Sequence, residues 1–188
     1  MIRLFAALPI PEEIGLALAR RQQGVEGARW RPLEALHMTL RFFGEIREDV
    51  ARDLDAELSA LHAQAFEIAF SGVGAFGEGP DIHTIWAGVA DSEPLRRLAR
   101  ACETAARRSG LKAETRQYRP HMTLAYLRHA DPAEVAAWIQ ANNLLKSPPI
   151  VIQSFGLYSS FLGSEQAHYR LEAAYPLRGG ANPRPHGP

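Results

Sequence analysis

Alternating apolar and polar residues in several short segments of the chain predict β-strands. Side chains of a strand point in turn to its two faces, so a half-buried strand alternates with a period of two. Glycine, proline and charged residues separate these segments, as expected for turns between strands. The predicted strands are Ile2–Leu8, Phe66–Phe76, Ile85–Val89, Ile150–Ser160 and Tyr169–Leu177.

Four other segments have apolar residues at every third or fourth position, which predicts helices with one buried face. In the third of them, Leu95, Leu98, Cys102 and Ala105 form the apolar face. Proline in the first turn is typical of a helix start, because its missing N–H is not needed there. The last helix has Asp131 in the N-cap position. The predicted helices begin near Pro11, Val50, Pro94 and Asp131.

The tetrapeptide HMTL occurs twice, at His37–Leu40 and His121–Leu124. The offset is 121 − 37 = 84 residues, and the surrounding elements repeat at about the same offset. Gly72 in one predicted strand corresponds to Gly156 in another. The chain therefore contains two copies of a strand–helix–strand–helix–strand unit, followed by one more strand.

This duplication predicts an α+β fold of two lobes related by an approximate two-fold axis. Each lobe is expected to hold a small antiparallel sheet and two helices, with a cleft between the lobes. Neither half is large enough to bury a stable core by itself, so residues 1–178 are predicted to form one domain with a shared core. Residues 179–188, rich in glycine and proline, are predicted to be a disordered tail.

Each HMTL segment places one imidazole and one hydroxyl on the same face of its strand. Residues two apart in a strand project together, so His37 lies beside Thr39 and His121 beside Thr123. The methionine and leucine of each motif point to the other face, into apolar packing. Two such strands meeting across a two-fold axis would bring two histidines and two threonines into one cleft.

Such a cleft suits in-line displacement at phosphorus without a metal or other cofactor. One histidine takes a proton from the attacking oxygen, and the other gives a proton to the leaving oxygen. The threonine hydroxyls can donate to the non-bridging phosphate oxygens. A two-histidine metal site is the alternative, although neither motif contains an acidic residue and Glu45 is the nearest one.

Charge and cysteine content narrow the choice of partners and location. Lys plus Arg and Asp plus Glu both number 21, so no overall basic field exists to hold a long nucleic acid. The single cysteine, Cys102, excludes an intramolecular disulfide and a cysteine zinc site. No apolar run reaches the roughly 18 residues of a membrane span, and the N-terminus does not fit a signal peptide. We expect a cytoplasmic monomer that does not bind membranes.

The segments HMTLRFFGE and RPHMTLAY resemble the paired motifs of the two-histidine phosphoesterase superfamily. Together with the opening RLFAALPIPEE, they resemble most the RNA 2′,3′-cyclic phosphodiesterases, also called 2′-5′ RNA ligases. The resemblance implies hydrolysis of a terminal 2′,3′-cyclic phosphate of RNA to a 2′-phosphate, and reverse 2′-5′ ligation without ATP. It also implies that His37 is the acid and His121 the base, which the symmetry of the motifs leaves open.

One departure from the family pattern concerns the phosphate. Family members often carry a basic residue two positions after the second motif, where this chain has Tyr126. Arg119 lies two residues before His121, and Arg41 lies four residues after His37. Residues an even number apart in a strand project from the same face, so either arginine could supply the charge. We therefore expect Arg119, Arg41 and Tyr126 to contribute to substrate binding.

Two other functions remain open from the sequence. The substrate could be a small cyclic nucleotide, ADP-ribose 1″,2″-cyclic phosphate or a 2′-5′ oligonucleotide instead of an RNA end. The protein could also be a nucleotide-binding module without turnover, although both histidines and both threonines are intact.

Overall fold

The computed structural model describes residues 1–162 and 167–179, so most of the predicted tail at 179–188 lies outside the described residues. Two short 3₁₀ turns, η1 (Leu33–Ala35) and η2 (Gly79–Asp81), interrupt the loops. The helices are α1 (Glu12–Ala19), α2 (Glu48–Ser59), α3 (Glu93–Arg108) and α4 (Pro132–Asn142). The strands are β1 (Ile2–Leu8), β2 (Ala28–Trp30), β3 (Met38–Ile46), β4 (Phe66–Ile68), β5 (Phe70–Phe76), β6 (Thr84–Val89), β7 (His121–Leu127), β8 (Ile150–Ile152), β9 (Ser154–Leu162) and β10 (Ala167–Pro176).

The predicted α+β fold and the duplicated order of elements are confirmed. The first copy is β1, α1, β3, α2 and β5, and the second is β6, α3, β7, α4 and β9. The predicted strands Phe66–Phe76 and Ile150–Ser160 are wrong in one respect, because each is two strands separated by one residue, Ala69 or Gln153. Each break occurs where the chain leaves one ladder and enters another.

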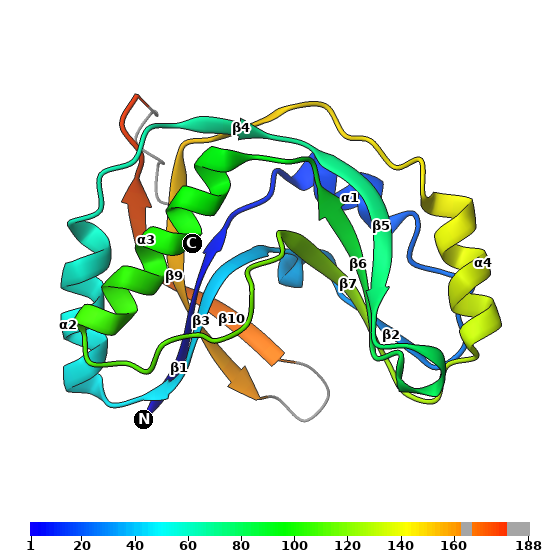
Figure 1. The fold of residues 1–188 in the computed structure, drawn as a ribbon, viewed down its shortest axis with the longest axis horizontal. Helices are drawn as coiled ribbons and strands as arrows, with labels where there is room; N and C mark the ends of the chain where they lie inside the picture. Colours follow the sequence, from blue (N-terminus) through cyan, green and yellow to red (C-terminus); the bar gives the residue numbers. More distant parts are fainter. Residues whose placement is uncertain (163–166, 180–188) are drawn as a thin grey trace.

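The strands form two four-stranded antiparallel sheets, in the orders β10-β9-β1-β3 and β2-β7-β6-β5 (Figure 1). The last strand of each copy belongs to the sheet of the other copy. Strand β5 of the first copy pairs with β6, and β9 of the second copy pairs with β1. Each sheet is therefore built from both halves of the chain, which the sequence pattern did not predict.

The short ladder between β4 and β8 marks the approximate two-fold axis. Its central pair joins Glu67 to Val151, and 151 − 67 = 84, the offset of the repeat. The flanking pairs are Phe66 with Ile152 and Ile68 with Ile150. A residue paired with its own counterpart must lie on the axis that relates the two copies.

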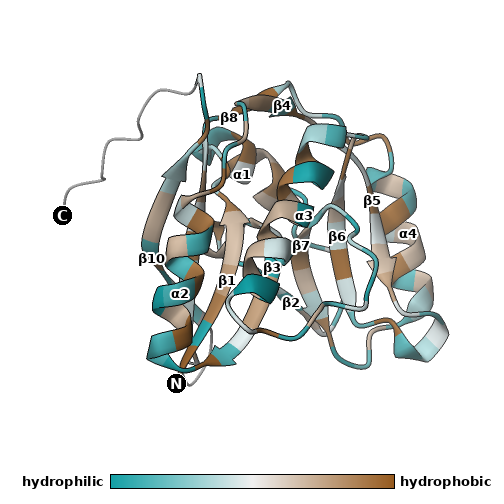
Figure 2. Cartoon of the chain, turned by 60° about the vertical axis from the view of Figure 1, so that its left-hand side comes forward, coloured by the Kyte–Doolittle hydropathy of each residue, from teal (hydrophilic) through white to brown (hydrophobic). Residues whose placement is uncertain are grey.

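The helices cover the outer faces of the sheets. Helices α2 and α3 lie together beside the sheet of β1, and α4 lies beside β5 (Figure 1). The predicted face of α3 is confirmed, since Leu95, Leu98, Cys102 and Ala105 are all buried. Hydrophobic residues concentrate on the central strands, whereas the outer turns of α2 are hydrophilic (Figure 2).

The N-terminus of α4 is capped as predicted. The Asp131 carboxylate accepts a hydrogen bond from the Ala133 N–H at 2.8 Å. Glu134, in the capping-box position, instead accepts from the Glu26 N–H at 2.8 Å, so it joins the helix to the loop before β2. The Trp138 indole also contacts this region, donating to the Arg21 carbonyl at 2.9 Å.

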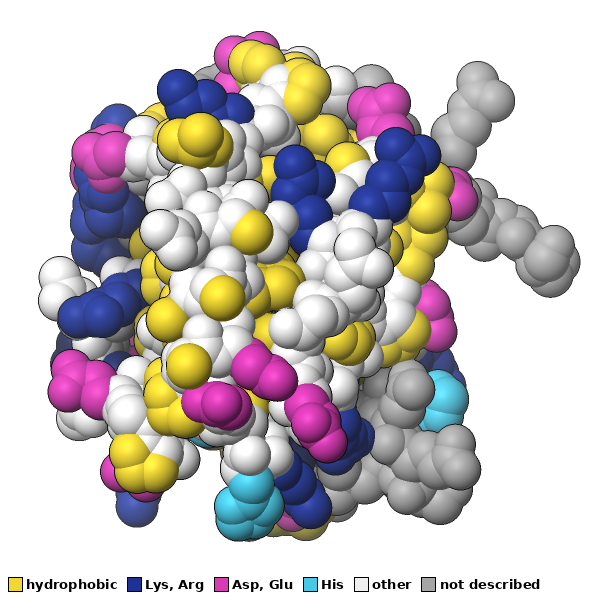
Figure 3. All heavy atoms as spheres, turned by 90° about the vertical axis from the view of Figure 1, so that its right-hand side faces the viewer, with side chains coloured by type: hydrophobic (Ala, Val, Ile, Leu, Met, Phe, Trp, Pro, Cys, Tyr) yellow, Lys and Arg dark blue, Asp and Glu magenta, His cyan; other side chains and the backbone are white. Residues whose placement is uncertain are grey.

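The surface carries no field of a single sign on the face over α4 and β5. Basic and acidic side chains lie in small separate groups there, with apolar residues between them (Figure 3). This agrees with the formal net charge of zero. Within the described ranges, no helix combines the length and hydropathy needed to cross a bilayer.

The exchange of β5 and β9 predicts that neither half of the chain folds alone. A fragment of residues 1–78 would retain β1 and β3 without β9, and β5 without β6, leaving pairs too small to be stable in water. By circular dichroism, each of the fragments 1–78 and 79–188 should lack a cooperative thermal transition. The mixed fragments should regain one. A cooperative transition of fragment 1–78 alone would show that the halves are independent.

Candidate active site

The two HMTL motifs lie on β3 and β7, and both strands are bulged at the same residue of the motif. In the ladder with β1, Thr39 pairs with Ala7 and Arg41 with Ala6, so Leu40 has no partner. In the ladder with β6, Leu124 is likewise skipped. A bulge places two residues opposite one and re-aims the side chains that follow it. The bulges sit 84 residues apart, so they belong to the repeat.

Both motifs line the same small cavity, of about 50 Å³. As the alternation predicts, the methionine and leucine of each motif are buried on the other face of the strand. The residues around the cavity are His37, Thr39, His121 and Thr123, together with Arg31, Ala35, Tyr126 and Tyr169. Two imidazoles and two hydroxyls from strands 84 residues apart therefore face one cavity.

The His37 ring lies in an aromatic cradle. It follows the η1 turn, directly before β3. Its centroid is 4.7 Å from that of Phe5 and 4.9 Å from that of Tyr169, whose ring meets it edge-on at 78°. Burial, and next the positive charge of Arg31, lower the pKa of His37 to about 4, while a backbone hydrogen bond with Ala35 raises it. Near neutral pH the free protein therefore holds His37 uncharged.

The His121 ring is held by a backbone carbonyl and by Phe76. Its Nδ1 lies 2.7 Å from the Arg119 carbonyl oxygen. Because a carbonyl oxygen only accepts, this contact assigns the proton to Nδ1 and leaves Nε2 unprotonated in the neutral ring. Phe76 meets the ring edge-on at 4.8 Å. Burial lowers the pKa of His121, and the hydrogen bond with Arg119 raises it.

Arg31 and Tyr169 line the cavity although the sequence analysis did not select them. The Arg31 Nη2 donates to the Tyr169 hydroxyl at 2.6 Å. Arg31 reaches the cavity because its N–H extends the pairing of β2 with β7, donating to the Leu124 carbonyl at 2.8 Å. The alternation of side chains along a strand could not predict that Arg31 lies near His37, because the η1 turn separates the two residues. The strand of Tyr169 was predicted, but no motif indicated which face meets the site.

The other two arginines expected at the substrate lie elsewhere. The Arg41 Nε donates to Glu103 at 2.6 Å and its Nη2 donates to the Lys112 carbonyl at 3.0 Å, so its guanidinium is engaged away from the cavity. The bulge at Leu40 breaks the parity that would have placed Arg41 beside Thr39. Arg119 contributes its carbonyl to His121, but its side chain does not line the cavity.

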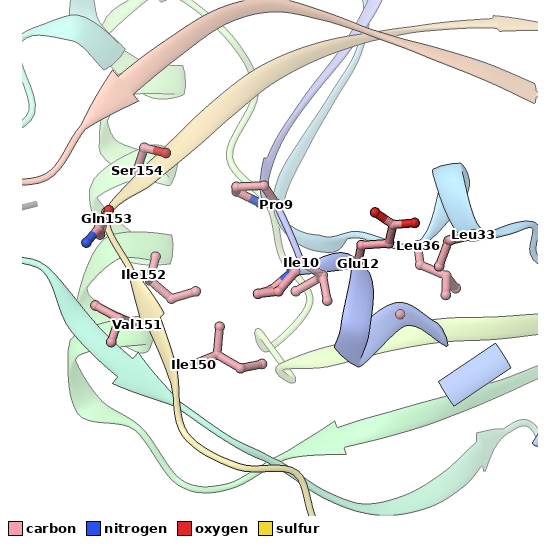
Figure 4. Close-up of a pocket in the computed structure, with 12 residues that line it drawn as sticks. Pro9, Ile10, Glu12, Leu33, Leu36, Ile150, Val151, Ile152, Gln153 and Ser154 are labelled. Carbon is pink, nitrogen blue, oxygen red and sulfur yellow. The ribbon is translucent and has the colours of Figure 1, made fainter. Parts of the chain in front are cut away.

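A larger cavity, of about 520 Å³, lies beside β8 and the start of α1 (Figure 4). Its lining is mainly aliphatic, with Ile10, Leu36 and Ile152, and the polar groups include Glu12 and Gln153. None of the described residues that line it is a histidine, a cysteine or a basic residue. The smaller cavity is therefore the better candidate for acid–base chemistry. Across the described part of the chain, no three His, Cys, Asp or Glu side chains converge as a metal site.

Comparison with known proteins places residues 10–159 in the 2′-5′ RNA ligase superfamily. A relative from Archaeoglobus fulgidus, named RNA 2′,3′-cyclic phosphodiesterase, is 27% identical over 172 residues, which cover 90% of this chain and 97% of the relative. A Thermus thermophilus protein of the same name is 30% identical over an alignment of 200 positions, which covers 95% of this chain and 91% of that protein.

Solved structures show the same fold. Protein TT0787 of Thermus thermophilus superposes with a TM-score of 0.78 at 25% identity, covering 95% of this chain and 99% of that one. Escherichia coli LigT complexed with 3′-AMP gives a TM-score of 0.77 at 23% identity, covering 94% of this chain and 98% of that one. The bilobal α+β fold with its duplicated motif is thus that of the two-histidine phosphoesterases, and the chain belongs to the 2′-5′ RNA ligase superfamily.

Proposed function

We propose that the protein hydrolyses the 2′,3′-cyclic phosphate at an RNA 3′ end to a 2′-phosphate, using His37 and His121 as the acid–base pair. The observation that carries this proposal is the single cavity lined by both histidines and both threonines of the repeat. The names of the Archaeoglobus and Thermus relatives support this substrate.

In the proposed reaction, water attacks phosphorus and the bond from phosphorus to O3′ breaks. One histidine takes a proton from the water, and the other gives a proton to O3′, which leaves as a hydroxyl. The products are a 2′-phosphate and a free 3′-hydroxyl. Thr39 and Thr123 donate hydrogen bonds to the non-bridging oxygens. If a 5′-hydroxyl attacked phosphorus in place of water, the same displacement of O3′ would form a 2′-5′ bond.

The family resemblance assigns the base to His121 and the acid to His37. The environment of His121 suits a base, because its Nδ1 is occupied by the Arg119 carbonyl and its Nε2 has a free lone pair. His37 must instead be protonated, which burial and Arg31 disfavour in the free protein. A phosphodiester anion in the cavity would offset the charge of Arg31, so we propose that the substrate itself promotes protonation of His37.

A small nucleotide substrate is the second candidate, and the net charge of zero favours it over a long RNA. The small cavity, of about 50 Å³, does not distinguish the two candidates, because both present the same cyclic phosphate to it. The neutral net charge provides no strong attraction for a long RNA. Competition between a short RNA and a mononucleotide, each ending in a 2′,3′-cyclic phosphate, distinguishes the two by their relative kcat/KM.

Replacement of either cavity histidine should abolish most of the activity. With a short RNA ending in a 2′,3′-cyclic phosphate, and with EDTA present, His37→Ala and His121→Ala are each expected to lower kcat by ~10²–10⁴. His62→Ala, which alters an exposed histidine, should retain the wild-type rate. Either cavity variant acting at the wild-type rate would contradict the proposal. A wild-type protein inactive in EDTA but restored by a divalent metal would make the histidines ligands.

The dependence of kcat/KM on pH should peak on the acid side of 6.5. Catalysis needs one protonated and one neutral imidazole, whichever performs each role. The pKa of His37 is about 4 and that of His121 lies below 6.5, so the singly protonated pair is most abundant between these values. Above the higher pKa, kcat/KM should fall about tenfold per pH unit. A maximum at pH 8, with the fold intact by circular dichroism, would contradict this account.

A further inference from the structure

Arg31 is a buried cation that pairs with none of the described carboxylates. It retains 8% exposure, although it stands at the wall of the cavity. Among the described residues, no Asp or Glu oxygen lies within ion-pair distance of its guanidinium. The eight residues around the cavity include one permanent cation, Arg31, and no acidic side chain. A buried charge is costly unless an opposite charge or hydrogen bonds compensate it.

The guanidinium is held in place by two tyrosines. Its Cζ lies 5.2 Å from the ring centroid of Tyr169 and 5.6 Å from that of Tyr126. The hydrogen bond to the Tyr169 hydroxyl and the backbone contact with Leu124 fix its position further. A guanidinium has five N–H donors, and the bond to Tyr169 uses only one of them. The remaining donors are available to a ligand in the cavity.

The surroundings of Arg31 select an anion with several acceptor oxygens. Arginine binds phosphate through paired hydrogen bonds that its planar fork presents together. The cavity also offers the hydroxyls of Thr39 and Thr123, which donate to the same kind of oxygen. Tyr126, two residues after the second motif, is itself uncharged, and the Arg31 guanidinium lies over its ring.

We propose that Arg31 is the phosphate-binding cation of this active site, supplied by the residue that follows β2 rather than by β7. This inference rests on the proposed function, because it assigns a residue to the phosphate of that substrate. It gives Tyr126 and Tyr169 the role of positioning the guanidinium. The same role is not expected of Arg41, whose guanidinium is paired with Glu103, or of Arg119, whose side chain lies outside the cavity.

The test compares Arg31→Gln and Arg31→Lys with Arg41→Gln, Arg119→Gln and a control, Arg97→Gln. Arg97 lies on α3 with its side chain 68% exposed, so its variant should behave as wild type. Binding of inorganic phosphate is followed by the NMR shifts of the His37 and His121 rings, which requires no turnover. KM and kcat are measured with the cyclic-phosphate RNA, and thermal unfolding reports whether each variant is folded.

For Arg31→Gln we expect the phosphate dissociation constant and KM to rise roughly 10- to 100-fold, with a smaller change in kcat. Arg31→Lys keeps the charge and should recover part of the affinity, which a merely structural role would not explain. The inference is overturned if Arg31→Gln binds phosphate as wild type does. It is also overturned if Arg119→Gln or Arg41→Gln shows the loss instead, or if the lysine variant is folded yet binds phosphate no better than the glutamine variant.

The two proposals can fail separately. A wild-type protein that binds phosphate through Arg31 but converts no cyclic phosphate would refute the proposed hydrolysis and leave the role of Arg31 standing. A wild-type protein with full hydrolysis, whose Arg31→Gln variant keeps its phosphate affinity and KM, would refute the role of Arg31 alone.

Discussion

The antiparallel pairing of β9 with β1 and of β5 with β6 joins the two halves of the chain into one molecule. Each half contributes its last strand to the sheet of the other half. The crossing points lie together in the β4–β8 ladder, at the approximate two-fold axis. With the sheets connected in this way, β3 and β7 lie against each other, and the motif of each strand faces the same cavity. The symmetry of the site follows from this pairing.

The repeated bulge shapes the cavity within that frame. A regular strand would place the residue two after each threonine on the same face as the threonine. Because Leu40 and Leu124 are skipped in their ladders, the regular alternation of side chains between the two faces is interrupted in both motifs. Arg41 consequently pairs with Glu103 on α3, and the cavity receives its positive charge from Arg31. The two lobes are symmetric in their histidines and threonines but asymmetric in charge, and the positive charge of Arg31 contributes to the lowered pKa of His37.

Local pattern was sufficient to predict most of the elements, the repeat and the four motif residues that the cavity brings together. HMTL at a fixed offset identified two histidines and two threonines, and helical spacing identified the buried face of α3. The exchange of strands could not be predicted, because alternation in Phe66–Phe76 shows a strand but not its partner. Arg31 could not be predicted either, since its place depends on an edge pairing with β7 and on the η1 turn. Both features depend on contacts between distant parts of the chain, and Arg31 supplies the positive charge of the site.

The environment of the two histidines has a common physical cause. Aromatic rings and buried strands remove water from both imidazoles, so both prefer the neutral form. Catalysis by a pair requires one of them to be charged, and none of the described residues around the cavity is a carboxylate that could stabilise that charge. The phosphodiester is the anion that would do so. Binding of substrate and activation of the acid are thus one electrostatic event in this account.

The most direct test of the central claim is a crystal structure of the protein with a 2′-mononucleotide, the product of the proposed reaction. We expect its phosphate to lie in the small cavity, within hydrogen-bonding distance of both His37 and His121 and of the hydroxyls of Thr39 and Thr123. A phosphate bound in the larger cavity beside β8, or one that contacts a single histidine, would contradict the claim that the two motifs form one active site.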